Sequence, residues 1–236
     1  MNSRWMDIKA QDGGRFKGYL SLPHQTEKGT KGPGIVLIQE IFGVNSHIRA
    51  VADQYASDGY TVLAPDIFWR MQPMVDLGYV GQDRDKGIEY MQKMDVSGAV
   101  KDLAATVTAL RSLPECTGKV ASVGYCMGGM LSYLCAASAG VDAAVCYYGG
   151  GIHTRLDEAG KIKCPLLFHF AGNDSNIPAP AVAAVKQAFA GRANARIDVY
   201  PGAEHGFNCW DRSFYNQQSS ALARGRSLSF LATTIS

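Results

Sequence analysis

Short apolar runs alternate with longer amphipathic stretches along most of this chain, and the alternation predicts strands and helices that follow one another. Runs such as 34–39 and 143–148 are continuously apolar, which is typical of strands buried on both faces of a parallel sheet. The stretches between such runs have the period and length of helices. We expect strands over residues 6–10, 15–22, 34–39, 61–65, 120–124, 143–148, 165–170 and 195–200, and helices over residues 45–58, 83–94, 96–113, 129–137, 181–189 and 219–231.

Strands that are separated by helices of this length predict a mostly parallel central sheet with helices on both faces. The first two strands are the exception, because the turn Asp12-Gly-Gly14 is expected to join them as an antiparallel pair. A chain of 236 residues suits one α/β domain, so we expect a single domain over residues 1–236. Ligands of such sheets bind at the carboxyl ends of the strands, where the candidate functional residues should lie.

The sequence Gly124-Tyr-Cys-Met-Gly128 lies between a predicted strand and a predicted helix, which is the setting of a nucleophile elbow. The turn is tight and strains its central residue, so its neighbours must be small. The elbow aims Cys126 at the start of the helix, where backbone N–H groups and the helix dipole favour a thiolate. Taken alone, the motif is also compatible with a buried cysteine in a glycine-rich turn.

Two later strand ends carry an acid and an imidazole. Asp174 follows the strand over 165–170, and His205 follows the strand over 195–200. A cysteine nucleophile needs a base to remove its proton, and that base needs a carboxylate to orient it. Singly, Asp174 could be a turn residue and His205 a loop histidine. Nucleophile, acid and histidine in this chain order match the α/β-hydrolase fold, however, and predict a triad of Cys126, Asp174 and His205.

The loop Gln39-Glu-Ile-Phe-Gly43 follows the first buried strand, where this fold completes an oxyanion hole. We therefore expect the backbone N–H groups of Ile41 and Met127 to be the two donors. A carboxylate beside an oxyanion hole opposes the charge that develops there, so Glu40 needs a different role. Either Glu40 faces solvent, or it lies near the thiol and shares in its proton chemistry.

Several motifs in this chain occur together in one known family. They are Gln39–Asn45, Gly59–Tyr60, Ala64–Asp66, Gly124–Gly129, Tyr147–Gly149, Ala171–Asp174 and Gly202–Phe207. The combination resembles the dienelactone hydrolase family, or carboxymethylenebutenolidases, over about residues 8–231. The resemblance implies a monomeric α/β-hydrolase without metal or cofactor, a carboxylic ester hydrolase of aromatic compound degradation. It implies that an enol lactone is opened through an acyl-cysteine, as from dienelactone to maleylacetate, with catalytic roles for Cys126, Asp174, His205 and Glu40.

The resemblance also bears on substrate binding, because the family's lactone carries a carboxylate that two arginines bind. One of these arginines corresponds to Arg84, whereas Cys209 stands at the position of the other. Arg212 is near in sequence but is not expected in the pocket. We therefore expect one cation fewer there and a tolerance for less acidic or larger substrates. The aromatic residues Phe42 and Tyr148 are expected to line the pocket.

Composition and charge exclude several classes of partner. The net charge is +2 and the basic residues are scattered, so neither a nucleic-acid surface nor a membrane-binding patch is expected. No apolar run approaches the roughly 18 residues that span a bilayer, and the first ten residues lack the apolar core of a secretory signal. The six cysteines form no C-x-x-C pair, which favours reduced thiols and a cytoplasmic location. A small-molecule lactone or ester is the expected partner.

Two other functions stay open at this point. The chain could be an esterase or thioesterase that acts on a less acidic substrate, although it lacks an obvious cationic patch for a phosphopantetheine or coenzyme A tail. It could also be a binding protein that keeps the hydrolase fold but turns over little substrate, although the complete triad argues against this.

Overall fold

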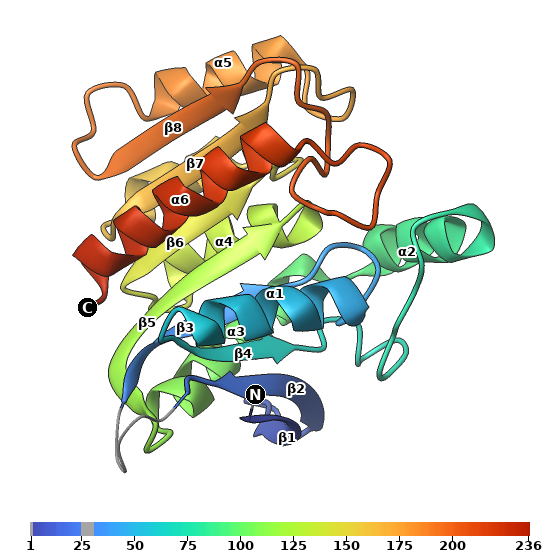
Figure 1. Ribbon diagram of the computed structural model, residues 1–236, viewed down its shortest axis with the longest axis vertical. Coiled ribbons are helices and arrows are strands. Elements are labelled where there is room, and N and C mark those ends of the chain that lie inside the picture. The colour runs from blue at the N-terminus through green and yellow to red at the C-terminus, as the bar shows by residue number, and fades with distance from the viewer. Residues whose placement is uncertain (1, 25–30) are drawn as a thin grey trace.

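The computed structural model describes residues 2–24 and 31–236, which are built around one central sheet (Figure 1). In this described part the sheet has eight strands in the order β1-β2-β4-β3-β5-β6-β7-β8. The strands are β1 (Asn2–Lys9), β2 (Arg15–Leu22), β3 (Gly32–Ile38), β4 (Thr61–Pro65), β5 (Cys116–Tyr125), β6 (Ala143–Tyr147), β7 (Leu166–Ala171) and β8 (Ala195–Tyr200).

The sheet is mostly parallel, as the sequence predicts. All neighbouring pairs from β4 through β3 to β8 are parallel, whereas β1 and β2 form the expected antiparallel pair. β2 also pairs antiparallel with β4, a pairing that no local pattern predicts. The six parallel strands therefore end at one edge of the sheet, and that edge collects the candidate functional residues.

Helices cover both faces of the sheet, which confirms the predicted α/β-hydrolase architecture. In Figure 1, α1 and α6 lie in front of the sheet and α3 and α4 lie behind it, while α2 projects beyond the strand ends. The α-helices are α1 (Ser46–Ser57), α2 (Gly81–Lys93), α3 (Val96–Arg111), α4 (Met127–Ser138), α5 (Ala179–Ala188) and α6 (Gln217–Thr234).

Local sequence explains how α1 and α4 differ. The side chain of Asn45 caps α1 by accepting a hydrogen bond from the backbone N–H of Ile48, at 3.2 Å. The buried residues of α1 recur every three or four positions, so one face packs on the sheet and the other meets solvent. The first nine residues of α4 are all buried, which agrees with its almost wholly apolar sequence. α4 is therefore enclosed by the rest of the molecule.

A buried polar network ties the last helix to the sheet. Ser227 of α6 is hydrogen-bonded to the Nε2 atom of His169 at 2.9 Å and to the phenol of Tyr147 at 2.7 Å. The Nδ1 atom of His169 is hydrogen-bonded to the phenol of Tyr200 at 2.8 Å. Burial lowers the pKa of His169 to about 3, so the ring stays neutral. The network joins β6, β7, β8 and α6.

Some local structure differs from what the sequence predicts. β5 begins at Cys116, several residues before the apolar run at 120–124 that predicts it. Two short 3₁₀-helices, η1 (Ile152–Thr154) and η2 (Leu156–Lys161), occupy a stretch for which no element is predicted. They are too short to show a period in the sequence. Among the described helices, none has both the length and the apolar character needed to cross a membrane.

Candidate active site

Cys126 lies at the turn between β5 and α4, with a backbone φ of 55°. A positive φ is unfavourable for a cysteine, and the surroundings must hold it in place. The backbone N–H of Cys126 donates to the carbonyl of Tyr147 at 3.0 Å. A Cβ atom added to Gly124 would lie 1.9 Å from the carbonyl oxygen of Gly128. The turn therefore has the strained, glycine-dependent geometry of a nucleophile elbow.

His205 and Asp174 meet beside this turn. The Nδ1 atom of His205 lies 2.8 Å from the Oδ2 atom of Asp174. The other carboxylate oxygen, Oδ1, accepts hydrogen bonds from the backbone N–H groups of Asn176 at 2.8 Å and Ile177 at 3.1 Å. Because its oxygens have these partners, the carboxylate is held in one orientation, and Nδ1 of the ring is fixed with it.

The remaining ring nitrogen of His205 is available to Cys126. Burial disfavours a charge on the ring, but the Cys126 thiolate and the Asp174 carboxylate outweigh burial and raise the pKa of His205 to about 10. The surroundings of His205 thus favour the protonated ring, the imidazolium. The three side chains predicted from chain order are brought together at one edge of the sheet.

Glu40 lies inside the protein, only 1% exposed, and does not face solvent. Its Oε1 atom is 3.4 Å from the Nη1 atom of Arg212. Its Oε2 atom is also buried and has no hydrogen-bond partner among the residues that the structure describes. Burial raises the pKa of Glu40, although Arg212 and His205 oppose the increase. Of the two alternatives left open by the sequence, the solvent-facing one is wrong.

Arg212 lines the same cavity as Cys126, a position for which the sequence gives no warrant. Two consecutive turns bring it there, because Cys209 N–H donates to the carbonyl of Gly206 and Arg212 N–H donates to the carbonyl of Cys209. Gly206 has a φ of 84°, and a Cβ atom on it would lie 2.5 Å from Nη1 of Arg212. The expectation that the cavity has one cation fewer is therefore wrong. The guanidinium of Arg212, which lies later on the same loop than Cys209, lines the cavity instead.

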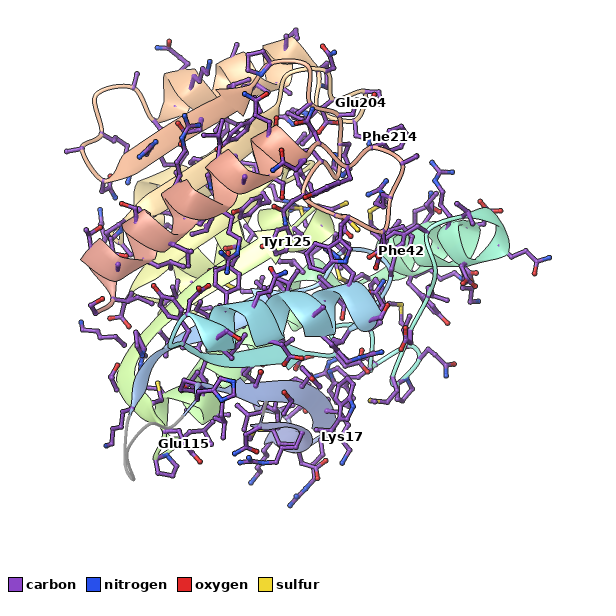
Figure 2. All side chains as sticks on the ribbon, viewed as in Figure 1. Lys17, Phe42, Glu115, Tyr125, Glu204 and Phe214 are labelled. Atoms are coloured by element: carbon purple, nitrogen blue, oxygen red, sulfur yellow. The ribbon has the colours of Figure 1, made fainter. Side chains whose placement is uncertain are left out.

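Cys209 itself does not replace that cation. Its side chain is fully buried, and burial raises the pKa of its thiol to about 12. Phe42 and Phe214 lie at the same end of the molecule (Figure 2), and the guanidinium carbon of Arg212 is 5.8 Å from the centre of each ring. Aromatic rings at this distance contribute favourable cation–π contacts, which help to position the guanidinium.

The cavity beside Cys126 has a volume of about 500 Å³, a size that is typical of small-molecule sites. Arg84 and Phe42 line it, as expected. Tyr148 does not. It is fully buried behind His205, with ring centres 5.1 Å apart, and its hydroxyl has no partner within the described residues. The lining consists of Ile41, Phe42, Arg84, Ile88, Met91, Met94, Val96, Cys126, Met127, Met130, Gly150, Gly151, Arg155, Asn176, His205 and Arg212.

The two backbone groups expected to form an oxyanion hole both belong to residues of this lining. Neither Ile41 N–H nor Met127 N–H donates a hydrogen bond to another group in the described part of the chain. Met127 is the first residue of α4, where the helix dipole favours negative charge. Both donors are therefore free to receive an anionic oxygen near Cys126.

Several lining residues are not predicted by the sequence. Ile88 and Met91 lie four and seven residues after Arg84 on α2, so helical periodicity could have grouped them with Arg84 on one face. Arg155 and Asn176 lie in short irregular segments and give no such signal.

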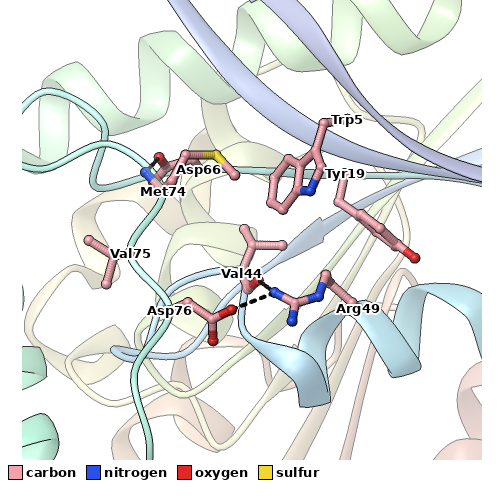
Figure 3. Close-up of a pocket in the computed structure, with 8 residues that line it drawn as sticks. All are labelled: Trp5, Tyr19, Val44, Arg49, Asp66, Met74, Val75 and Asp76. Carbon is pink, nitrogen blue, oxygen red and sulfur yellow. Dashed lines mark hydrogen bonds and ion pairs between the residues drawn. The ribbon is translucent and has the colours of Figure 1, made fainter.

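A second cavity, of about 400 Å³, lies beside β1 and β2 (Figure 3). It shares no lining residue with the cavity at Cys126, and neither a cysteine nor a histidine lines it. Its Arg49 already pairs with Asp76 at 2.8 Å and donates to the carbonyl of Val44 at 2.6 Å. The cavity at Cys126 is therefore the better candidate for an active site.

Comparison with known proteins agrees with this geometry. The model of a family described as "Dienelactone hydrolase family" matches residues 16–235. The carboxymethylenebutenolidase of Pseudomonas putida is 34% identical over 233 residues, which cover 98% of this chain and 97% of that protein. A solved structure from Klebsiella pneumoniae, described provisionally as a dienelactone hydrolase, has a TM-score of 0.84 and 26% identity, with 98% of each chain covered. A dienelactone hydrolase-like promiscuous phosphotriesterase from metagenomic libraries shares the fold, with a TM-score of 0.82, 21% identity and full coverage of both chains.

Proposed function

The chain belongs to the dienelactone hydrolase family, and we propose that it hydrolyses enol lactones and related esters through an acyl-cysteine at Cys126. One observation supports this most directly. The sulfur of Cys126, the ring of His205 and the carboxylate of Asp174 meet at the edge of a cavity that is also lined by arginines. This is the arrangement that covalent catalysis by a cysteine requires.

In the first step, the Cys126 thiolate attacks the lactone carbonyl and forms a carbon–sulfur bond. The carbonyl electrons move to oxygen, and the N–H groups of Ile41 and Met127 stabilise the resulting anion. Such a donor contributes about 3–4 kcal/mol in comparable enzymes. The ring carbon–oxygen bond then breaks, and the enolate that leaves takes the proton held by His205. The acyl group stays on the sulfur as a thioester.

In the second step, neutral His205 removes a proton from water, and the hydroxyl adds to the thioester carbonyl. Collapse of this intermediate breaks the carbon–sulfur bond and releases a carboxylic acid and the thiolate. Asp174 stabilises the imidazolium in both steps, because it holds Nδ1 at 2.8 Å. The proton that His205 accepts from water restores the starting state.

Glu40 is proposed to hold or take the thiol proton, so that Cys126 becomes a thiolate only when substrate binds. Its burial and its raised pKa support this role, since a carboxyl group that resists ionisation can carry a proton near the sulfur. The proximity of Arg212 sets how readily that proton is lost. A substrate carboxylate that draws Arg212 away would change the charge on Glu40.

Sulfur favours substrates with a stabilised leaving group, because a thiolate that attacks an alkyl ester is expelled more easily than the alkoxide. An enolate is such a leaving group, which supports enol lactones over ordinary alkyl esters. Arg84 and Arg212 in the lining support an acidic substrate rather than the less acidic alternative.

The proposal is tested by incubating the protein with dienelactone and following both turnover and protein mass. We expect turnover and a transient acyl adduct on the peptide that contains Cys126. Cys126→Ser should be far slower, and Cys164→Ala, which removes a thiol outside the cavity, should match the parent. If Cys126→Ser opens dienelactone as fast as the parent, the proposed role of sulfur is wrong.

We also propose a monomer in the cytoplasm. All six cysteines are free thiols, which suits a reducing compartment. Light scattering after size-exclusion chromatography and cell fractionation would test the two parts of this proposal.

A further inference from the structure

Three arginines line the cavity. Arg84 comes from α2, Arg155 from the junction of η1 and η2, and Arg212 from the loop after β8. Among the described lining residues there is no aspartate or glutamate. Glu40 is not one of the lining residues, but its carboxylate pairs with Arg212 and offsets the charge of that guanidinium. Arg84 and Arg155 therefore have no carboxylate partner among the described lining residues.

Arg155 is held firmly by its backbone. Its carbonyl accepts a hydrogen bond from the phenol of Tyr133 at 2.9 Å, and its N–H donates to the carbonyl of Ile152 at 2.9 Å. These two bonds join the residue to α4 and to η1. The two bonds therefore fix the backbone position from which the side chain of Arg155 extends.

The side chain of Arg155, by contrast, has no protein partner in the described residues. Its Nε atom is buried without a hydrogen-bond acceptor, and the guanidinium forms no ion pair there. The nearby acid Glu158 pairs instead with Lys161, at 2.8 Å. A guanidinium has five N–H donors in a rigid fork, and a buried donor left unpaired is destabilising. An acceptor on a ligand would remove this destabilisation.

We propose that Arg155 binds a second carboxylate of the substrate, so that the preferred substrates are enol lactones with two acidic groups. The inference rests on the proposed lactone hydrolysis at Cys126. We assign a first carboxylate to Arg84 and Arg212, and Arg155 lines the cavity from a separate segment with its Nε–H unused. A planar guanidinium binds a carboxylate through two parallel hydrogen bonds. The cavity of about 500 Å³ also has room for more than a small ring with one carboxylate.

The test compares three substrates with the same lactone ring. They are the methyl ester of dienelactone, dienelactone itself, and dienelactone with a second carboxylate on the ring. The measured quantity is the ratio of kcat/KM for the dicarboxylate to kcat/KM for the monocarboxylate. Because this ratio is compared between enzymes, intrinsic differences in substrate reactivity cancel. We expect Arg155→Ala to lower the ratio by about 10- to 100-fold, the range for one charge-assisted hydrogen-bonding group.

Two further variants keep the test decisive if Arg155→Ala folds poorly. Arg155→Lys keeps the charge without the fork and should retain part of the preference, whereas Arg155→Gln should lose most of it. Lys163→Ala is the matched control, because it removes an exposed cation just after η2 that lies outside the cavity and leaves the pair of Glu158 and Lys161 intact. This control should leave the ratio and the rates as in the parent.

The outcomes separate this inference from the proposed function. A parent enzyme whose ratio is unaffected by all three Arg155 variants would overturn the second carboxylate site. The same conclusion holds if the variants slow all three substrates by one common factor, which would indicate a structural role. Failure of the proposed function would look different, because the parent would then open none of the three lactones.

Discussion

Two glycine-to-alanine substitutions in helices should change stability in opposite directions. Gly128 lies in the first turn of α4, and Gly225 lies in the middle of α6. A Cβ atom on Gly128 would lie 2.4 Å from the carbonyl oxygen of Ile38 and 2.5 Å from that of Gln39. A Cβ atom on Gly225 would meet nothing within 4 Å. The same chemical change therefore meets backbone in one helix and open space in the other.

The magnitudes follow from these contacts. Alanine in place of glycine stabilises a helix interior by up to about 1 kcal/mol, and Gly225→Ala should gain most of this. Overpacking costs about 1–3 kcal/mol, and the upper end is expected at Gly128 because backbone carbonyls cannot rotate away. Gly128→Ala should therefore lose about 1–2 kcal/mol net. The displaced carbonyls belong to the chain just before Ile41, so activity should also fall.

Urea unfolding followed by circular dichroism measures both free energies of unfolding under one set of conditions. The two variants should differ by about 2–3 kcal/mol, with the parent between them. If Gly128→Ala is as stable as Gly225→Ala, the close approach of α4 to the end of β3 is not as described. In that case the geometry assigned to the elbow would have to be revised.

Three other predictions concern single side chains. Asp174→Asn should lower kcat/KM for dienelactone by about 10²- to 10⁴-fold, because an amide cannot stabilise the imidazolium; a steady-state loss below tenfold would contradict this role. Arg212→Ala should lower kcat/KM by about tenfold or more for dienelactone but by less for its methyl ester, and equal losses would count against carboxylate binding. Burial, reinforced by Arg212, lowers the pKa of His47 to about 4 from 6.5, so the unfolded state binds more protons between these pH values and stability falls as the pH falls. The parent should lose free energy of unfolding between pH 7 and pH 4, and His47→Gln should remove about 3 kcal/mol of that loss. Urea unfolding at the two pH values measures this, and an unchanged pH dependence would refute it.

The three catalytic residues can be predicted because each of them lies in a short sequence pattern that is recognisable on its own. The elbow needs glycines on both sides of Cys126, and the acid and the histidine directly follow strands whose apolar runs are easy to recognise. Because the strands are parallel, their carboxyl ends meet at one edge of the sheet, and the residues that follow them are brought together there. The order of the three residues along the chain was therefore sufficient to predict that they meet.

The charged lining of the cavity could not be predicted in this way. Arg212 enters because Gly206 leaves room for its guanidinium, a contact that depends on how the loop folds back rather than on a motif. Arg155 reaches the cavity from between two 3₁₀-helices that give no periodic signal. Tyr148, expected from its motif to line the cavity, lies behind His205 instead. The positions of these three side chains depend on side-chain orientation and on loop folding, and both are set by tertiary packing.

Tyr147 links the nucleophile to the far end of the chain. Its carbonyl receives the N–H of Cys126, while its phenol is held by Ser227 on α6. Mutations on α6 can therefore alter catalysis without touching the substrate. Directed-evolution libraries for this enzyme should sample the inner face of α6 as well as the cavity, and affinity tags are better attached away from that helix.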